Sequence, residues 1–148
     1  VDSPTYDMEG PLKLIDTYPS MAEVTAKIPD FVGNIEQAVP YYSAVKVAGK
    51  KLYNMARGGK EMPVDLPVKK VTIYGIEILD FSEKTVPFTD LGEQKLPVLT
   101  CLVNCSSGTY IRSLAHDLGG VLFNLRRTRV GDYIVQDSED FLKMQPTN

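Results

Sequence analysis

The chain has 148 residues, with 19 acidic and 16 basic side chains and a formal net charge of −3. Hydrophobic residues make up 43% and charged residues 24%, which is typical of a globular domain and excludes disordered, collagen-like and uniformly basic nucleic-acid-binding chains. A chain of this length buries roughly 70% of its unfolded surface, so we expect one hydrophobic core that needs no disulfide or metal.

The first predicted element is a helix that begins at Met21. Ser20 and Glu23 have the spacing of a capping box, in which the hydroxyl and the carboxylate satisfy backbone amides reciprocally. Pro29 lacks a backbone donor and predicts that the helix ends or kinks there, before Gly33 closes it. The apolar positions have helical spacing: Met21, Val24, Ile28 and Phe31.

Residues 37–67 show neither helical nor strand periodicity and are interrupted by prolines and glycines. Loops of this length within a domain are commonly functional. The loop is basic from Lys46 to Lys60, with no acidic residue between, and its tyrosines could stack on RNA bases. A solvated lysine-rich loop explains the composition equally well. The candidate RNA-binding residues of the loop are Tyr42, Lys46, Lys50, Lys51, Tyr53 and Arg57.

Two antiparallel strands are predicted next. Residues 68–79 alternate between apolar and polar, and the phase changes at Gly75, which indicates a β-bulge. A polar connection follows through Lys95, and residues 96–105 are apolar on both faces, as in a central strand. Cys101 and Cys105 would lie about 13 Å apart on this strand, too far for a disulfide. Free thiols favour a reducing compartment.

A second helix is predicted after Gly108, with its end near Gly119 and Gly120. Its apolar residues form one face: Ile111, Leu114, Ala115, Leu118 and Leu122. Arg112 and His116 share the opposite face. Residues 125–135 predict a final strand with three clustered arginines: Arg126, Arg127 and Arg129. The order of elements predicts an α+β domain with a mixed or antiparallel sheet and flanking helices.

Several chemistries lack support. Ser113, His116 and Asp117 lie on one helix and cannot form a hydrolase triad, and no Gly-x-Ser-x-Gly turn is present. Glycine-rich motifs for nucleotide cofactors are absent. The single histidine has no partner at zinc-site spacing, so no metal is expected. No segment has the composition of a membrane span or a signal peptide.

Two segments resemble motifs of the TruB family of tRNA pseudouridine synthases. The first is Tyr42-Ser-Ala-Val-Lys-Val-Ala-Gly-Lys-Lys-Leu-Tyr53, and the second is Cys105-Ser-Ser-Gly-Thr-Tyr-Ile-Arg112-Ser-Leu-Ala-His-Asp-Leu-Gly119. They occur in the order of the family, and the resemblance extends from about Tyr6 to Val135. The second motif is also similar to guide-RNA-dependent synthases, whereas the first favours the stand-alone tRNA enzymes.

The resemblance implies a reaction and a partner. Members of this family isomerise uridine to pseudouridine in the TΨC arm of tRNA, using an aspartate that attacks the nucleoside and no cofactor or metal. It also implies that Arg112 pairs with this carboxylate and keeps it ionised, as arginine does well. The tRNA stem-loop is therefore the expected partner of a cytoplasmic or organellar protein, with no membrane association and a monomeric state when complete.

The remaining implied roles concern the base and the RNA arm. Tyr110 would lie against the flipped base, near the point where a proton leaves C5. Leu125 would support the pocket together with Arg126 and Arg127, and the segment from Tyr42 to Arg57 would close over the RNA. The implied fold is the pseudouridine synthase-like α+β domain, with residues 37–67 as its RNA-contacting insertion.

The chain also departs from the family pattern. The nucleophile motif Gly-x-Leu-Asp does not occur in it, and neither Asp2, Asp7 nor Asp16 fits that motif. Residues 1–148 are therefore expected to be a C-terminal part of the catalytic domain, without its nucleophile-bearing N-terminal part and inactive alone. The family usually has more residues between Gly120 and Leu125. Two alternatives remain open: a non-catalytic RNA-binding or tRNA chaperone module of the same fold, and a structural domain unrelated to RNA.

Overall fold

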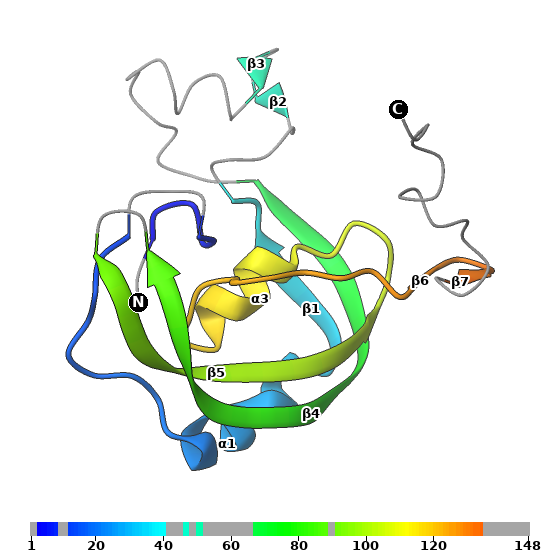
Figure 1. Cartoon of the computed structure of the whole chain (residues 1–148). Coiled ribbons are helices and arrows are strands. Elements are labelled where there is room, and N and C mark those ends of the chain that lie inside the picture. Colours follow the sequence, from blue (N-terminus) through cyan, green and yellow to red (C-terminus); the bar gives the residue numbers. More distant parts are fainter. Residues whose placement is uncertain are drawn as a thin grey trace, which may run out of the picture.

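A computed structural model of the chain describes residues 3–8, 12–40, 46–47, 50–51, 67–88 and 91–134 (Figure 1). The described residues form an α+β arrangement with antiparallel strand pairing, as the sequence predicts. In chain order the elements are α1 (Met21–Phe31), β1 (Gly33–Ala38), β2 (Lys46–Val47), β3 (Lys50–Lys51), β4 (Val68–Phe88), β5 (Gly92–Cys105), α3 (Ile111–Asp117), β6 (Arg129–Val130) and β7 (Tyr133–Ile134).

The predicted capping box at the start of α1 is confirmed. The Ser20 hydroxyl accepts from the Glu23 N–H at 3.3 Å, and the Glu23 carboxylate accepts from the Ser20 N–H at 2.7 Å. The pKa of Glu23 is lowered, first by the hydrogen bond that its carboxylate accepts from the Ser20 N–H and then by one from the Ser20 hydroxyl. The helix continues past Pro29 to Phe31, so of the two outcomes predicted at the proline, an end or a kink, the end is wrong by two residues. The proline carbonyl can still accept, and it does so from the Val32 N–H at 3.3 Å.

The main sheet has three strands in the order β1-β4-β5, with β4 in the centre. The bulge predicted at Gly75 is confirmed by a register shift between Ile73 and Gly75. A second shift between Ile78 and Asp80 changes the phase again, so the alternation does not reveal that β4 continues to Phe88. The predicted polar connection through Lys95 is therefore wrong, because most of it is strand. β5 lies at the edge of this sheet and not at its centre.

The sequence pattern misses strand β1 and places its last two residues, Gln37 and Ala38, in the loop. β1 pairs with β4 in antiparallel register, Gly33 opposite Ile73 and Ala38 opposite Val68. Its inward positions carry a glycine, Ile35 and a buried glutamine, with relative burial that alternates along the strand. Only one of its six residues, Ile35, is large and apolar, so the strand gives no period-2 signal and the sequence does not reveal it.

The core lies between the helices and the sheet. One buried cluster is formed by Val24 of α1, Ile73 of β4, Leu114 of α3 and Leu118, the residue that follows α3. Figure 1 shows α3 inside the curve of the long β4–β5 hairpin. Cys101 and Cys105 are free, as predicted, and burial raises the pKa of the Cys101 thiol. No helix in the described ranges combines the length and apolar character that a bilayer crossing requires.

A tight turn connects β5 to α3 and is fixed to the central strand. The Thr72 N–H donates to the Ser106 hydroxyl at 2.9 Å, and the Ser106 N–H donates to the Thr72 carbonyl at 2.8 Å. Gly108 has a φ of +79°, a conformation that favours glycine, and a Cβ here would meet the amine end of Lys69. The backbone that enters α3 is therefore determined by β4.

The end of the second helix, predicted near Gly119 and Gly120, is confirmed: α3 ends at Asp117, and Gly119 adopts a φ of +95° two residues later. Leu122, predicted on the apolar face of this helix, lies beyond its end. The predicted strand over 125–135 is a short β6–β7 hairpin that turns at Gly131, which has a φ of +59°. The clustered arginines precede or begin this hairpin and are exposed.

Leu114→Ala should destabilise the fold strongly, because the Leu114 side chain is 2% exposed and packs in the cluster that holds α3. We expect the free energy of unfolding in urea to fall by about 2 to 5 kcal/mol. Leu102→Ala is the matched control, since Leu102 is 46% exposed and should cost much less. Equal losses in the two variants would contradict the assignment of the core.

Gly108→Ala should lower the free energy of unfolding by about 1 to 2 kcal/mol, because alanine is strained at a positive φ. The side chain of Lys69 would also have to move. Gly75→Ala is the matched control, because Gly75 has no left-handed φ and open space where its Cβ would lie. A Gly75→Ala loss as large as that of Gly108→Ala in the same urea titration would show that the turn is not constrained.

Candidate active site

The first turn of α3 brings the two predicted catalytic residues, Tyr110 and Arg112, into a fixed backbone. Tyr110 is the N-cap residue and has an extended conformation, with no side chain of its own capping the helix. Its carbonyl accepts from the Leu114 N–H at 3.1 Å, which starts the helix. Leu114 is buried in the core, so packing of the apolar face of α3 determines which face presents Arg112.

A buried glutamine holds the backbone of Tyr110. The Gln37 side-chain oxygen accepts from the Tyr110 N–H at 2.9 Å, and its nitrogen donates to the Tyr110 carbonyl at 3.2 Å. One residue further on β1, the Ala38 carbonyl accepts from the Ser113 hydroxyl at 3.4 Å. β1 and α3 are therefore joined by side-chain hydrogen bonds at the point where the site begins.

Arg112 forms an ion pair with Asp7. Its Nη1 lies 2.9 Å from Oδ2 of Asp7, whose side chain is only 12% exposed, whereas the Arg112 side chain is 39% exposed. The other carboxylate oxygen of Asp7 accepts from the Thr5 hydroxyl at 2.7 Å. Sequence reasoning tested Asp7 only as a nucleophile and missed it as a partner of Arg112. Ser3, Thr5 and Asp7 are all buried, but this burial has no signal in the sequence.

The segment that carries Asp7 is fixed by two further contacts. The Leu122 N–H donates to the Tyr6 carbonyl at 2.9 Å, and the Met8 N–H donates to the Leu122 carbonyl at 3.2 Å, which makes a parallel bridge. The Tyr6 ring stacks on His116, with centroids 3.9 Å apart and planes 12° apart. Tyr6 has a φ of +63°, and the stack on α3 helps to hold this unusual conformation.

The charges around α3 suit the binding of an anion. A guanidinium has five N–H donors, and one contact to Asp7 through Nη1 leaves others to bind a second carboxylate or a phosphate. Burial raises the pKa of Asp117, at the end of α3, against the opposing effect of His116. Arg112 is thus a partly exposed cation held in one orientation.

The predicted pocket-support and RNA-binding residues do not join Tyr110 and Arg112 in one described cluster. Leu125, Arg126 and Arg127 are exposed, and neither arginine has an ion-pair partner within the described part of the chain. Lys46, Lys50 and Lys51 belong to the β2–β3 hairpin, of which only the backbone is described. Tyr42, Tyr53 and Arg57 lie outside the described residues. Across those same ranges, no three potential metal ligands form a group.

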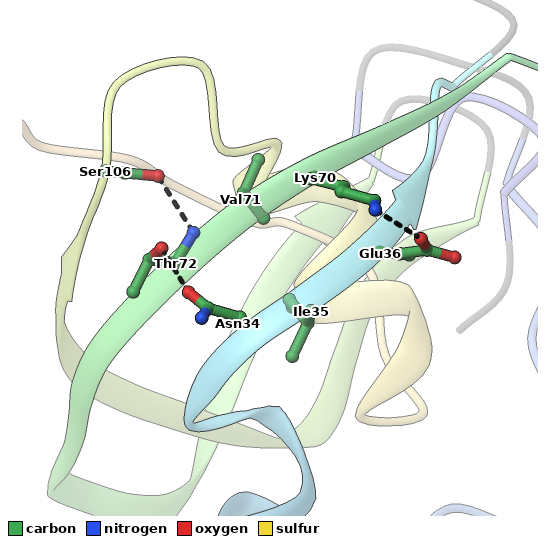
Figure 2. A pocket seen from close by; sticks show the side chains of 7 residues that line it. All are labelled: Asn34, Ile35, Glu36, Lys70, Val71, Thr72 and Ser106. Carbon is green, nitrogen blue, oxygen red and sulfur yellow. Dashed lines mark hydrogen bonds and ion pairs between the residues drawn. The ribbon is translucent and has the colours of Figure 1, made fainter.

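A groove of about 520 Å³ lies elsewhere, over β1 and β4 (Figure 2). Its polar side chains are engaged with one another: the Thr72 hydroxyl donates to the Asn34 carboxamide at 2.8 Å, and Lys70 lies 3.8 Å from Glu36. The groove includes neither Tyr110 nor Arg112, and none of its residues is a predicted site residue. The lining residues are Asn34, Ile35, Glu36, Lys70, Val71, Thr72 and Ser106.

Residues 1–111 match the family model described as "TruB family pseudouridylate synthase (N terminal domain)". The match is to the N-terminal domain and not to a C-terminal portion, which corrects the placement expected from the sequence. It ends within the motif that carries Tyr110 and Arg112.

Curated relatives named tRNA pseudouridine synthase B are similar to most of this chain. The protein from Clostridium kluyveri is 36% identical over 147 residues, covering 93% of this chain and 45% of the relative. The protein from a Nostoc species is 36% identical over 148 residues (93% and 46%), and that from Brucella ovis 37% over 148 residues (95% and 41%). The chain thus spans less than half the length of these relatives. On the match to the family model, the chain belongs to the TruB family of pseudouridylate synthases.

Proposed function

We propose that this chain forms the Tyr110 and Arg112 side of the active site of a tRNA pseudouridine synthase, which isomerises uridine in the TΨC arm. The observation that carries the proposal is the ion pair between Arg112 and Asp7, at the start of the helix that follows the Gly-Thr-Tyr-Ile-Arg motif. The relatives named tRNA pseudouridine synthase B support the reaction and its tRNA substrate. The pseudouridine synthase-like α+β fold is part of the same proposal.

The reaction itself demands little beyond positioned charges. The bond from C1′ to N1 of the uracil breaks, a bond from C1′ to C5 forms, and a proton moves from C5 to N1. Atoms and electrons balance without an oxidant or a reductant, which agrees with the expectation of no cofactor. A carboxylate nucleophile must be ionised to attack, and a neighbouring guanidinium favours that state.

Arg112 is suited to this role because Asp7 orients it from one side. The nearly buried Asp7 carboxylate fixes one edge of the guanidinium, and the partly exposed remainder can bind the nucleophilic carboxylate of a Gly-x-Leu-Asp motif. The pair therefore works as a preorganised support, in which little motion is needed when charge develops. Asp7 acts on the reaction through Arg112, so it is a positioning residue.

Tyr110 and the residues after Leu122 complete the base pocket in this proposal. A uridine flipped out of its stacked loop loses a few kcal/mol of stacking, which an aromatic ring can offset. Tyr110 offers that ring from the N-cap of α3. Leu125 offers an exposed apolar edge, and Arg126 and Arg127 lie beside it where they can bind phosphate.

Binding of the RNA arm is assigned to the segment between β1 and β4. The β2–β3 hairpin places Lys46 opposite Lys51 and Val47 opposite Lys50. A short hairpin that concentrates lysines suits contact with consecutive phosphates. Tyr42, Tyr53 and Arg57, in the same segment, would add stacking and charge. The concentrated charge, and not the net charge of −3, is what a tRNA arm meets.

Arg112→Ala should lower turnover by about a hundredfold or more, because it removes the group that orients the reacting carboxylate. Turnover is measured as tritium released from C5-labelled uridine in a TΨC stem-loop, with the natural polypeptide that contains residues 1–148. Arg112→Lys keeps the positive charge but lacks the planar guanidinium, so its turnover should remain close to that of Arg112→Ala. The affinity for the stem-loop, measured by filter binding, should change far less than turnover.

The same assay tests the proposed function. Tritium release at wild-type rate by Arg112→Ala would remove Arg112 from the site. Tight binding of the stem-loop by the unsubstituted polypeptide without any tritium release would replace the enzyme with the non-catalytic RNA-binding module. No binding at low salt would exclude both and leave the structural domain.

Substituting Lys50 and Lys51 together by alanine should weaken binding of the stem-loop and flatten its salt dependence. Each lost phosphate contact reduces the slope of log affinity against log salt by about one, so the double variant should lose about two. Lys84→Ala is the matched control, since its charge is already paired with Asp80 at 3.0 Å. An unchanged slope in the double variant would contradict the assignment of the hairpin to RNA.

A further inference from the structure

Gln37 is a buried polar side chain that has no part in the proposed reaction. It is 2% exposed, and it lies on β1 two residues after Ile35, which packs against the core. Its carboxamide makes both of its hydrogen bonds to one residue, Tyr110, which is 73 positions away in the sequence. These two bonds fix the orientation of the carboxamide, because the Tyr110 N–H can bond only to its oxygen and the Tyr110 carbonyl only to its NH₂ group.

A buried glutamine at this position is energetically unfavourable unless its carboxamide is hydrogen-bonded. Burial of a carboxamide costs free energy unless its hydrogen bonds are made, and the net gain from making them is small. An apolar side chain would fill an inward position of β1 without that cost. The two hydrogen bonds of the glutamine instead specify one arrangement of the chain that it binds.

The backbone of Tyr110, to which Gln37 binds, depends on contacts from outside its own segment. Tyr110 precedes α3, adopts extended φ and ψ angles of −90° and 101°, and has no capping side chain of its own. α3 has only seven residues, too few to fix its own first turn in isolation. The backbone angles of Tyr110 determine where its ring points, and Arg112 follows two residues later. Gln37 thus acts at the junction that aims both side chains.

We infer that Gln37 is a positioning residue that holds the Tyr110 backbone so that the Tyr110 ring and Arg112 face the target base together. The inference rests on the proposed function, because it assigns the held residues to a base pocket. Gln37 does not touch the base. It acts through Tyr110, so its loss should impair the reaction more than the binding of RNA, for which the phosphate contacts of the lysine hairpin supply most of the affinity.

The test substitutes Gln37→Met, which keeps a similar length and volume and removes both hydrogen bonds. Hydrogen exchange at the Tyr110 amide should accelerate at least about tenfold beyond the change in amides of β4. Turnover in the tritium-release assay should fall at least about tenfold, while the affinity for the stem-loop stays within about twofold. Asn34→Ala is the matched control, because Asn34 is a carboxamide on the same strand that bonds to Thr72 and not to Tyr110.

Three results would overturn the inference: a Tyr110 amide as protected in Gln37→Met as in the unsubstituted protein, unchanged turnover, or equal losses of turnover and affinity. If Gln37→Met does not fold, the unsubstituted protein decides, because its Tyr110 amide and Gln37 carboxamide protons must exchange slowly. Absence of turnover in the unsubstituted polypeptide would overturn the proposed function. In that case the Tyr110 exchange rates, which need no activity, still decide whether Gln37 holds Tyr110.

Discussion

The ion pair between Arg112 and Asp7 is the interaction on which the proposed site depends, because it joins the beginning of the described chain to the helix that follows β5. Around it, the Leu122 bridge and the Tyr6–His116 stack fix the segment, and the Thr5 hydroxyl occupies the other oxygen of the carboxylate. A partly exposed pair of this kind adds modest stability. Its larger effect is to give a guanidinium one orientation before any substrate binds.

Each constraint on α3 comes from a different part of the fold. Packing of Leu114 and Leu118 on Ile73 and Val24 determines which face of the helix is outward. The turn at Gly108, bonded to Thr72 of β4, determines where the helix starts, and Gln37 of β1 determines the backbone just before it. A seven-residue helix held at both its apolar face and its first turn can present Tyr110 and Arg112 without being stable alone.

The sequence predicted the features that have strong local causes, such as the capping box at Ser20, the bulge at Gly75 and the helix after Gly108. It did not predict the elements that form through long-range pairing: β1 carries one large apolar residue and a buried glutamine, and a second bulge concealed the rest of β4. The partnership of Arg112 with Asp7 was invisible for the same reason. A polar residue buried by a distant partner has no periodic signature, whereas the Gly-Thr-Tyr-Ile-Arg motif is contiguous and identified both candidate catalytic residues.

The central proposal is that the target uridine lies against Tyr110 at the start of α3. Photocrosslinking tests it most directly, with 4-thiouridine placed at the modified position of a TΨC stem-loop and the crosslinked peptide identified by mass spectrometry. We expect the crosslink within residues 108–112, and a crosslink at the groove over β1 and β4, whose lining includes none of these five residues, would contradict this placement of the base.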